Sequence, residues 1–181
     1  MGLQNIATTA PRVVAAHGQS SLTSRKRHGV AVNAVAEFLR RHLEVPEIYL
    51  QPKMGLPIDI LAVNAAGSGD FHGVEIKVPN NFVTSTTNLI SYVRQLRSLP
   101  LHFKWLALPD AIAVKKIASH PMLFDASGIG RIGILLLTEN GDELPQITVL
   151  TQAQRFKISR DELTQAEGYI KKHKPDIEVR I

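Results

Sequence analysis

The feature that most constrains the fold of this chain is a pair of apolar segments joined by a short run of small residues. The segments span residues 57–64 and 72–78, and the connection between them, residues 65–70, consists of Ala, Gly, Ser and Asp. Small residues and an Asp between two alternating apolar runs are typical of a β-hairpin turn. We therefore predict two long antiparallel strands, and this pairing decides which side chains share a face.

The register of this hairpin follows if the turn centres on Gly67. Antiparallel pairing then sets Asp59 opposite Glu75 and Lys77 opposite Pro57. Because side chains alternate along a strand, the two acids and Lys77 share one face of the hairpin. The apolar residues of both strands fall on the other face: Ile58, Ile60, Val74, Ile76 and Val78.

Two carboxylates directly opposite each other need a compensating charge. Their Cβ atoms would lie about 5 Å apart, where like charges destabilise a sheet. A shared proton, the Lys77 ammonium or a hard cation held by oxygen ligands could offset the repulsion, and few carboxylates favour Mg²⁺. The alternative without a function is a solvated hairpin face that carries a cross-strand ion pair.

The rest of the chain alternates between helical and strand patterns. The apolar spacing predicts helices over 29–43 and 89–99 and a short helix over 111–119. Strands are expected over 47–51, 105–108, 132–138 and 146–150, and Ser159 and Glu162 form a capping box for a last helix that ends near 172, before an edge strand. The order helix, three strands, helix, strand predicts an α/β fold with a mixed central sheet flanked by helices.

The positive charge of the chain is concentrated near its start. The formal net charge is +5, yet residues 1–36 contain no Asp or Glu and include Arg12, Arg25, Lys26 and Arg27. From Glu37 onward the basic and acidic residues almost balance. With 181 residues, we expect one domain over 25–181 and a flexible basic arm over 1–24.

The first residues and the composition also bear on location. No apolar run reaches the core of a signal sequence or the roughly 18 residues of a membrane span, and the chain has no Cys, which removes disulfides and thiolate metal sites. We therefore expect a cytoplasmic protein without membrane contact. An acid-free, Ser-rich start also resembles an organellar transit peptide.

The residues Asp59 and Glu75-Ile76-Lys77 resemble the motif of the PD-(D/E)xK, or restriction-endonuclease-like, nuclease superfamily, with Ile58 where the motif name has proline. The expected element order over about residues 29–109 also resembles the core of that superfamily. The resemblance implies that Asp59 and Glu75 bind Mg²⁺, or Mn²⁺ in its place, with the carbonyl of Ile76 as a third ligand. It further implies that Lys77 orients or activates the attacking water.

Two further site residues are implied by the same resemblance. Many members use a glutamate on the first helix, and Glu37 is the only acid on that helix before its last turn; an i,i+4 ion pair with Arg41 explains it equally well. Some members place a glutamine on the helix after the lysine strand, where Gln95 stands near Tyr92.

The function implied is a metal-dependent DNA endonuclease, which hydrolyses phosphodiesters in restriction or defence, DNA repair or a mobile element. DNA is the expected partner, with RNA as the other substrate, and the resemblance is compatible with a homodimer or a larger complex. Arg25, Lys26 and Arg27 are the predicted nucleic-acid-binding residues. The competing hypothesis is a non-catalytic nucleic-acid-binding or assembly module on the same fold, whose binding is salt-sensitive and indifferent to metal.

Overall fold

The computed structural model describes residues 17–53, 58–64, 69–78, 86–109, 131–139 and 144–178, with side chains from Lys26 in the first helix and from Leu89 in the second. Its elements follow in the order α1 (His17–His42), β1 (Glu47–Leu50), β2 (Ile60–Asn64), β3 (Asp70–Ile76), α2 (Thr86–Arg97), β4 (Phe103–Pro109), β5 (Gly133–Thr138), β6 (Gln146–Thr151), α5 (Thr164–Ile170) and β7 (Ile177–Glu178). The predicted order of helix, three strands, helix and strand is therefore present.

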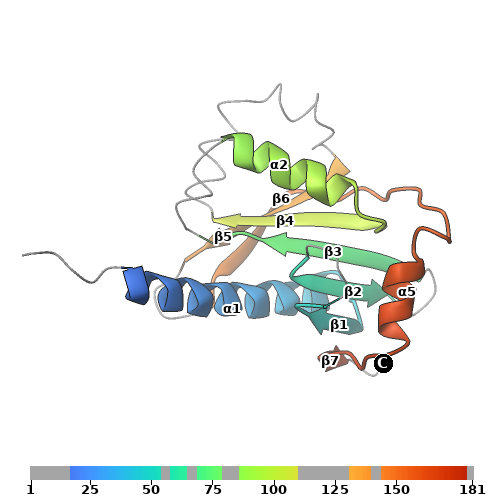
Figure 1. Ribbon diagram of the computed structural model, residues 1–181, viewed down its shortest axis with the longest axis horizontal. Coiled ribbons are helices and arrows are strands. Elements are labelled where there is room, and N and C mark those ends of the chain that lie inside the picture. The colour runs from blue at the N-terminus through green and yellow to red at the C-terminus, as the bar shows by residue number, and fades with distance from the viewer. Residues whose placement is uncertain are drawn as a thin grey trace, which may run out of the picture.

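The strands form one mixed sheet in the order β6-β5-β4-β3-β2-β1, to which the two-residue β7 adds at the β1 edge. The β3–β4 and β4–β5 pairs are parallel, and the other pairs are antiparallel. The predicted α/β class with a mixed sheet is confirmed (Figure 1).

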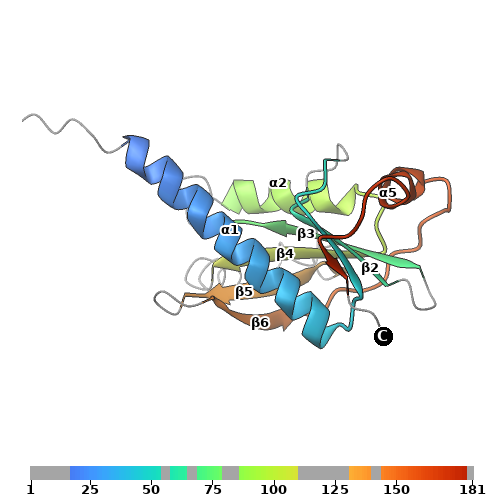
Figure 2. The same cartoon turned by 90° about the horizontal axis from the view of Figure 1, so that it is seen from below.

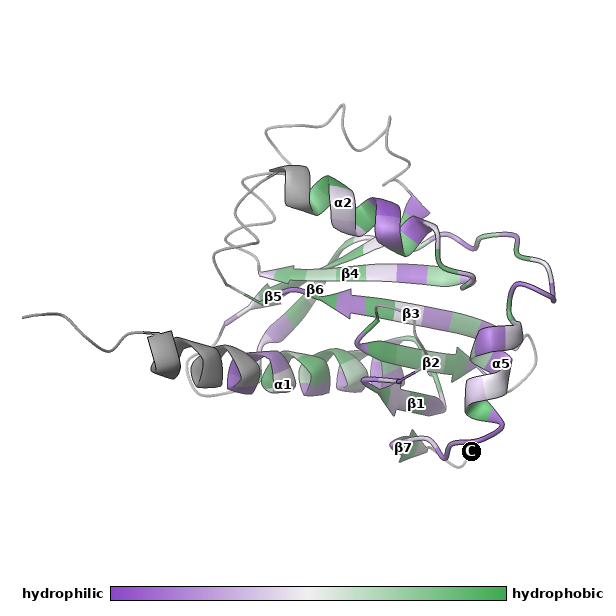
Figure 3. Cartoon of the chain, in the orientation of Figure 1, coloured by the Kyte–Doolittle hydropathy of each residue, from purple (hydrophilic) through white to green (hydrophobic). Residues whose placement is uncertain are grey.

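Helices cover both faces of the sheet. One buried cluster joins the apolar stripe of α1, which includes Ala31, Val35 and Leu39, to side chains of β1 to β5. The other cluster joins α2 and α5 to the opposite face, where Leu61 and Leu106 lie. Figure 2 shows α1 and α2 on the two sides of the strands, and Figure 3 shows the apolar residues of α1 and the strands between them. None of the helices in the described part of the chain is long and apolar enough to cross a membrane.

The predicted hairpin register is confirmed over the length of the β2–β3 ladder. Ile60 pairs with Val74 and Asn64 pairs with Asp70, as a turn centred on Gly67 requires. The ladder leaves this register at Asp59, whose N–H donates to the Val74 carbonyl at 2.8 Å. The prediction that Ile58 shares a face with Val74 and Ile76 was therefore wrong. Because the chain bends at Asp59, the side chain of Ile58 packs in the core on the α2 side of the sheet, whereas Val74 and Ile76 pack on the α1 side.

Helix α1 begins at His17, earlier than the expected start at residue 29. Residues 17–24, which we expected to belong to the flexible basic arm, therefore have helical backbone. They contain no proline and can extend a helix that has already formed, even though their sequence shows no apolar periodicity. The N-terminal turns of α1 extend beyond the sheet (Figure 2). Residues 1–16 lie outside the described residues, as does the short helix expected over 111–119.

The capping box forms, but it does not start the last helix. The Ser159 hydroxyl and N–H both donate to the Glu162 carboxylate at 2.8 Å, and this pair closes a turn over 160–163. Helix α5 starts only at Thr164, so the prediction placed its start too early.

A close contact fixes the centre of the sheet. Trp105 on β4, 2% exposed, pairs with Gly133 on β5. A Cβ added at Gly133 would lie 2.1, 2.4 and 2.7 Å from three atoms of the indole. Only glycine therefore fits beside this ring.

Candidate active site at the end of β3

Asp59 lies just before β2, and its carboxylate bonds to the end of β3. Its Oδ2 accepts a hydrogen bond from the Ile76 N–H at 2.7 Å, and its backbone carbonyl accepts one from the Gln51 N–H at 2.6 Å. Gln51 has a φ of 45°, a left-handed conformation that is uncommon for residues other than glycine. The end of β3 thus fixes the carboxylate of Asp59, and the residue after β1 fixes its backbone.

Glu75 and Lys77 form an ion pair at the same end of β3. The Lys77 ammonium also lies over the ring of Tyr92 on α2, 4.2 Å from its centroid. The side chains of Glu75 and Lys77 are 14% and 21% exposed, so the ion pair is only partly accessible to solvent. Glu75 Oε1 accepts from Lys77, while no residue in the described segments donates to its Oε2.

His28 on α1 completes this group and was missed from the sequence. Its Nε2 lies 3.1 Å from Asp59 Oδ1. A signal was present: His28 stands three residues before Ala31 and seven before Val35, on the buried stripe of the helix.

The electrostatics couple these side chains. The pKa of Glu75 is raised, first by burial and also by the negative charge of Asp59, against the opposing effect of Lys77. The pKa of His28 is raised, chiefly by its hydrogen bond to Asp59. The structure therefore brings Asp59, Glu75 and Lys77 together at the end of β3 and adds His28 and Tyr92. The predicted direct pairing of Asp59 with Glu75 was wrong, because the Asp59 N–H bonds to the Val74 carbonyl, one residue out of the ladder register.

Glu37 does not join this cluster. It accepts from Arg40 Nε at 2.8 Å and forms an ion pair with Arg41, and these arginines lower its pKa to about 2. It lines a groove between α1 and the start of β6. Nine residues separate Glu37 from His28, about 13 Å along a helix. The acid was selected because it was the only candidate on the helix, but the axial position of α1 on the sheet puts His28 there instead.

Gln95 and the basic run have different positions relative to the cluster. Gln95 is exposed one turn beyond Tyr92, and its side chain forms no hydrogen bond with the cluster among the described residues. Lys26 and Arg27 are exposed on α1 directly before His28. The side chain of Arg25 lies outside the described residues.

No protein-family model, curated protein or solved structure matches this chain.

The side chains of this cluster include oxygen donors for a divalent cation. Across the described segments, no three His, Asp or Glu side chains are arranged to hold a metal ion together. The two carboxylates of Asp59 and Glu75 are nevertheless hard oxygen donors at one strand end, and Mg²⁺ commonly uses one or two carboxylates and completes its shell with water and phosphate oxygens. The repulsion that raises the pKa of Glu75 is the kind that a cation offsets. The two carboxylates therefore suit Mg²⁺ by donor type.

Proposed function

We propose that the chain is a metal-dependent endonuclease of the restriction-endonuclease-like type that hydrolyses DNA phosphodiesters. The observation that carries the proposal is the convergence of Asp59, Glu75 and Lys77 at the end of β3, in a core of the helix, three strands, helix, strand order. RNA is the alternative substrate of the same chemistry.

Each residue has a separate role in this proposal. Asp59 and Glu75 would hold Mg²⁺, or Mn²⁺ in its place, with the Ile76 carbonyl as a further ligand. The bound cation supplies charge stabilisation at the scissile phosphate and a lower pKa for its water. Lys77 donates a hydrogen bond to the attacking water, and Tyr92 and Glu75 fix the position of its ammonium.

His28 and the basic residues before it bind the substrate in this scheme. One ring nitrogen of His28 contacts Asp59, and the other forms no hydrogen bond within the described segments. That second nitrogen can donate to a phosphate oxygen. Lys26 and Arg27 are exposed within one helical turn, where they can contact neighbouring phosphates.

The experiment is cleavage of a supercoiled plasmid with Mg²⁺ or Mn²⁺. Glu75→Ala and Lys77→Ala should abolish nicking, whereas Glu37→Ala, which removes an acid of α1 outside the cluster, should cleave like the wild type. A thermal-shift titration gives a second readout. Cation binding to the folded state should raise Tm in the wild type and in Glu37→Ala, but not in Glu75→Ala.

One observation favours a non-catalytic nucleic-acid-binding or assembly module. Each carboxylate already has a partner within the protein, because Asp59 contacts His28 and Glu75 forms an ion pair with Lys77. Such a module predicts salt-sensitive DNA binding through Arg25, Lys26 and Arg27, and no change of Tm with metal. Failure of both the cleavage and the Tm response would reject the nuclease in favour of this module.

A further inference from the structure

A second group of charges lies at the opposite end of β3 and β4 from the candidate active site. The segment 152–163, between β6 and α5, passes the start of β4 (Figure 1). Its backbone is fixed there, because the Phe156 N–H donates to the His102 carbonyl at 2.8 Å and the Gln154 N–H donates to the Arg131 carbonyl at 3.0 Å.

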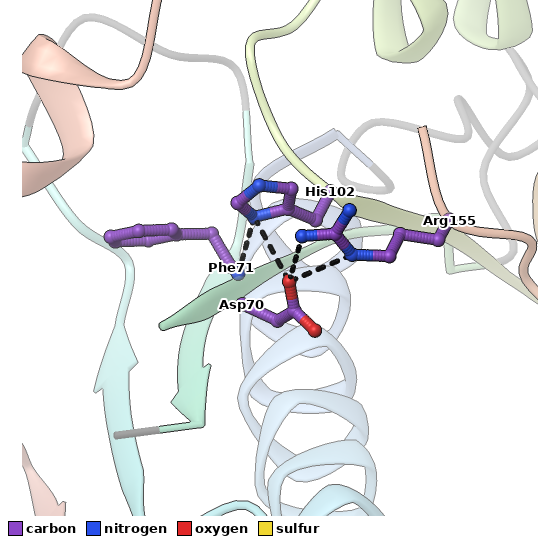
Figure 4. A network of polar contacts seen from close by, with 4 residues as sticks. All are labelled: Asp70, Phe71, His102 and Arg155. Atoms are coloured by element: carbon purple, nitrogen blue, oxygen red, sulfur yellow. Dashed lines mark hydrogen bonds and ion pairs between the residues drawn. The ribbon is translucent and has the colours of Figure 1, made fainter. Parts of the chain in front are cut away.

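A buried acid anchors this segment. Arg155 donates to Asp70 Oδ1 from Nε at 3.0 Å and from Nη2 at 2.8 Å (Figure 4). His102 Nδ1 accepts a hydrogen bond from the Phe71 N–H at 3.1 Å, and burial lowers the pKa of His102. The imidazole is therefore neutral, and Arg155 supplies the positive charge that balances Asp70.

The ring of Phe156 lies against two further cations. Lys104 Nζ is 4.0 Å and the Arg131 guanidinium is 4.6 Å from its centroid. Lys104 is 2% exposed, and its ammonium donates to the Arg97 carbonyl at the end of α2 at 2.7 Å. Burial, followed by the charges of Arg131 and Arg97, lowers the pKa of Lys104 to about 8. The cations thus repel one another.

The outer side of the segment adds more positive charge. Lys157 and Arg160 are exposed and form no ion pair within the described segments. The basic cluster therefore consists of Lys104, Arg131, Arg155, Lys157 and Arg160. Three acids lie in or beside these segments: Asp70, which is bound by Arg155, and the exposed Asp161 and Glu162. Five cations therefore face three acids. The positive charge of the cluster is in excess.

We propose that this basic cluster binds the phosphate backbone of the nucleic acid whose other part occupies the candidate active site. The identity of that anion as DNA rests on the proposed function. Charge complementarity favours a polyanion, and the exposed large apolar side chains of the described segments, Leu144 and Leu150, lie on or next to β6 rather than in the cluster, which disfavours a membrane surface.

The geometry fits one duplex at both places. Lys104 is on the α2 side of the sheet, like the Lys77–Tyr92 contact. Asp70, which holds Arg155, is seven residues before Lys77, about 23 Å along an extended strand. That length corresponds to about seven base pairs at 3.4 Å per pair.

The test is the binding of a fluorescein-labelled 20-base-pair duplex, measured by anisotropy in EDTA at several salt concentrations. The variant Lys157→Ala/Arg160→Ala removes two exposed cations whose side chains form no ion pair or hydrogen bond with the described residues. Each lost phosphate contact should reduce the slope of log K against log salt by about 1 and weaken binding about eightfold at 0.1 M salt. Arg131→Gln should act in the same direction, with its stability checked by urea unfolding.

The matched control is Lys172→Ala, which removes an exposed lysine just after α5. An unchanged slope in the double variant, or an equal loss in Lys172→Ala, would overturn the inference. So would wild-type binding to vesicles of phosphatidylcholine and phosphatidylserine without binding to the duplex. Because EDTA prevents cleavage, duplex binding through the cluster by a protein that cuts no DNA supports this inference while rejecting the nuclease. A protein that cuts DNA while the double variant binds normally does the reverse.

Discussion

Gly133→Ala should be strongly destabilising because of the indole beside it. The new Cβ would lie 2.1 Å from Trp105 Cε3, 2.4 Å from Cζ3 and 2.7 Å from Cδ2. Ordinary contact distances are about 3.5 to 4.0 Å, so the buried ring or strand β5 would have to move by more than about 1 Å. Overpacking typically costs about 1 to 3 kcal/mol, and three overlaps with one rigid ring indicate the upper end, about 3 kcal/mol.

Two other glycines provide matched controls. A Cβ at Gly73 meets Leu101 Cδ1 at 2.2 Å, which is the end of a flexible side chain, so Gly73→Ala should cost about 1 kcal/mol. A Cβ at Gly29 on α1 meets nothing within 4 Å, and Gly29→Ala should stabilise the protein by about 0.5 to 1 kcal/mol because alanine is the better helix former.

Urea unfolding followed by far-UV circular dichroism measures these differences; fluorescence is unsuitable because Trp105 is the single tryptophan and is itself perturbed. In a double-mutant cycle, Trp105→Leu should relieve part of the cost of Gly133→Ala. The reasoning would be refuted if Gly133→Ala cost no more than Gly73→Ala, or if the two substitutions in the cycle were additive.

Three further predictions concern the polar contacts. The contact between protonated His28 and Asp59, which raises the pKa of His28, stabilises the fold fully below about pH 6.5, the ordinary histidine value. This stabilisation is lost as the pH rises through the raised pKa of His28. The stability difference between the wild type and Asp59→Asn should therefore be larger at pH 5.5 than at pH 9, and equal differences in urea unfolding would contradict the ion pair. Asp70→Ala should cost about 2 kcal/mol because it removes the buried carboxylate that accepts two charged hydrogen bonds from Arg155; a loss below about 0.5 kcal/mol in the same assay would argue against the network. Tyr92→Leu removes the ring under the Lys77 ammonium, a contact worth about 1 kcal/mol, so plasmid cleavage should slow about fivefold. The metal-induced rise in Tm should remain in Tyr92→Leu, because the ring contacts Lys77 and not the carboxylates. If this rise in Tm disappeared, the role of the ring would be purely structural.

The hairpin and its register could be predicted because they depend on local information. Alternation and the small residues around Gly67 specify both strands, and the observed pairing agrees. The bend at Asp59 could not be predicted, because it depends on a hydrogen bond to Ile76, seventeen residues further along the chain. That bond releases Ile58 from the alternation that the sequence alone implies.

The residues that α1 contributes to the candidate active site could be predicted only in part. The apolar stripe identifies which face is buried, but it does not say how far the helix is shifted along the sheet. That shift decides whether His28 or Glu37 meets the hairpin acids, and it depends on packing between α1 and the strands. A titratable residue on the buried stripe, such as His28, was the better guide than the search for an acid.

The hydrogen bond from the Ile76 amide to Asp59 has a practical consequence. Most backbone amides in a strand donate to a backbone carbonyl, but the Ile76 amide donates to the Asp59 carboxylate, which is also the proposed metal ligand. Its nuclear magnetic resonance frequency should therefore change whenever that carboxylate gains or loses a partner. The amide proton of Ile76 can thus report whether a cation occupies the site, even in the absence of a nucleic-acid substrate.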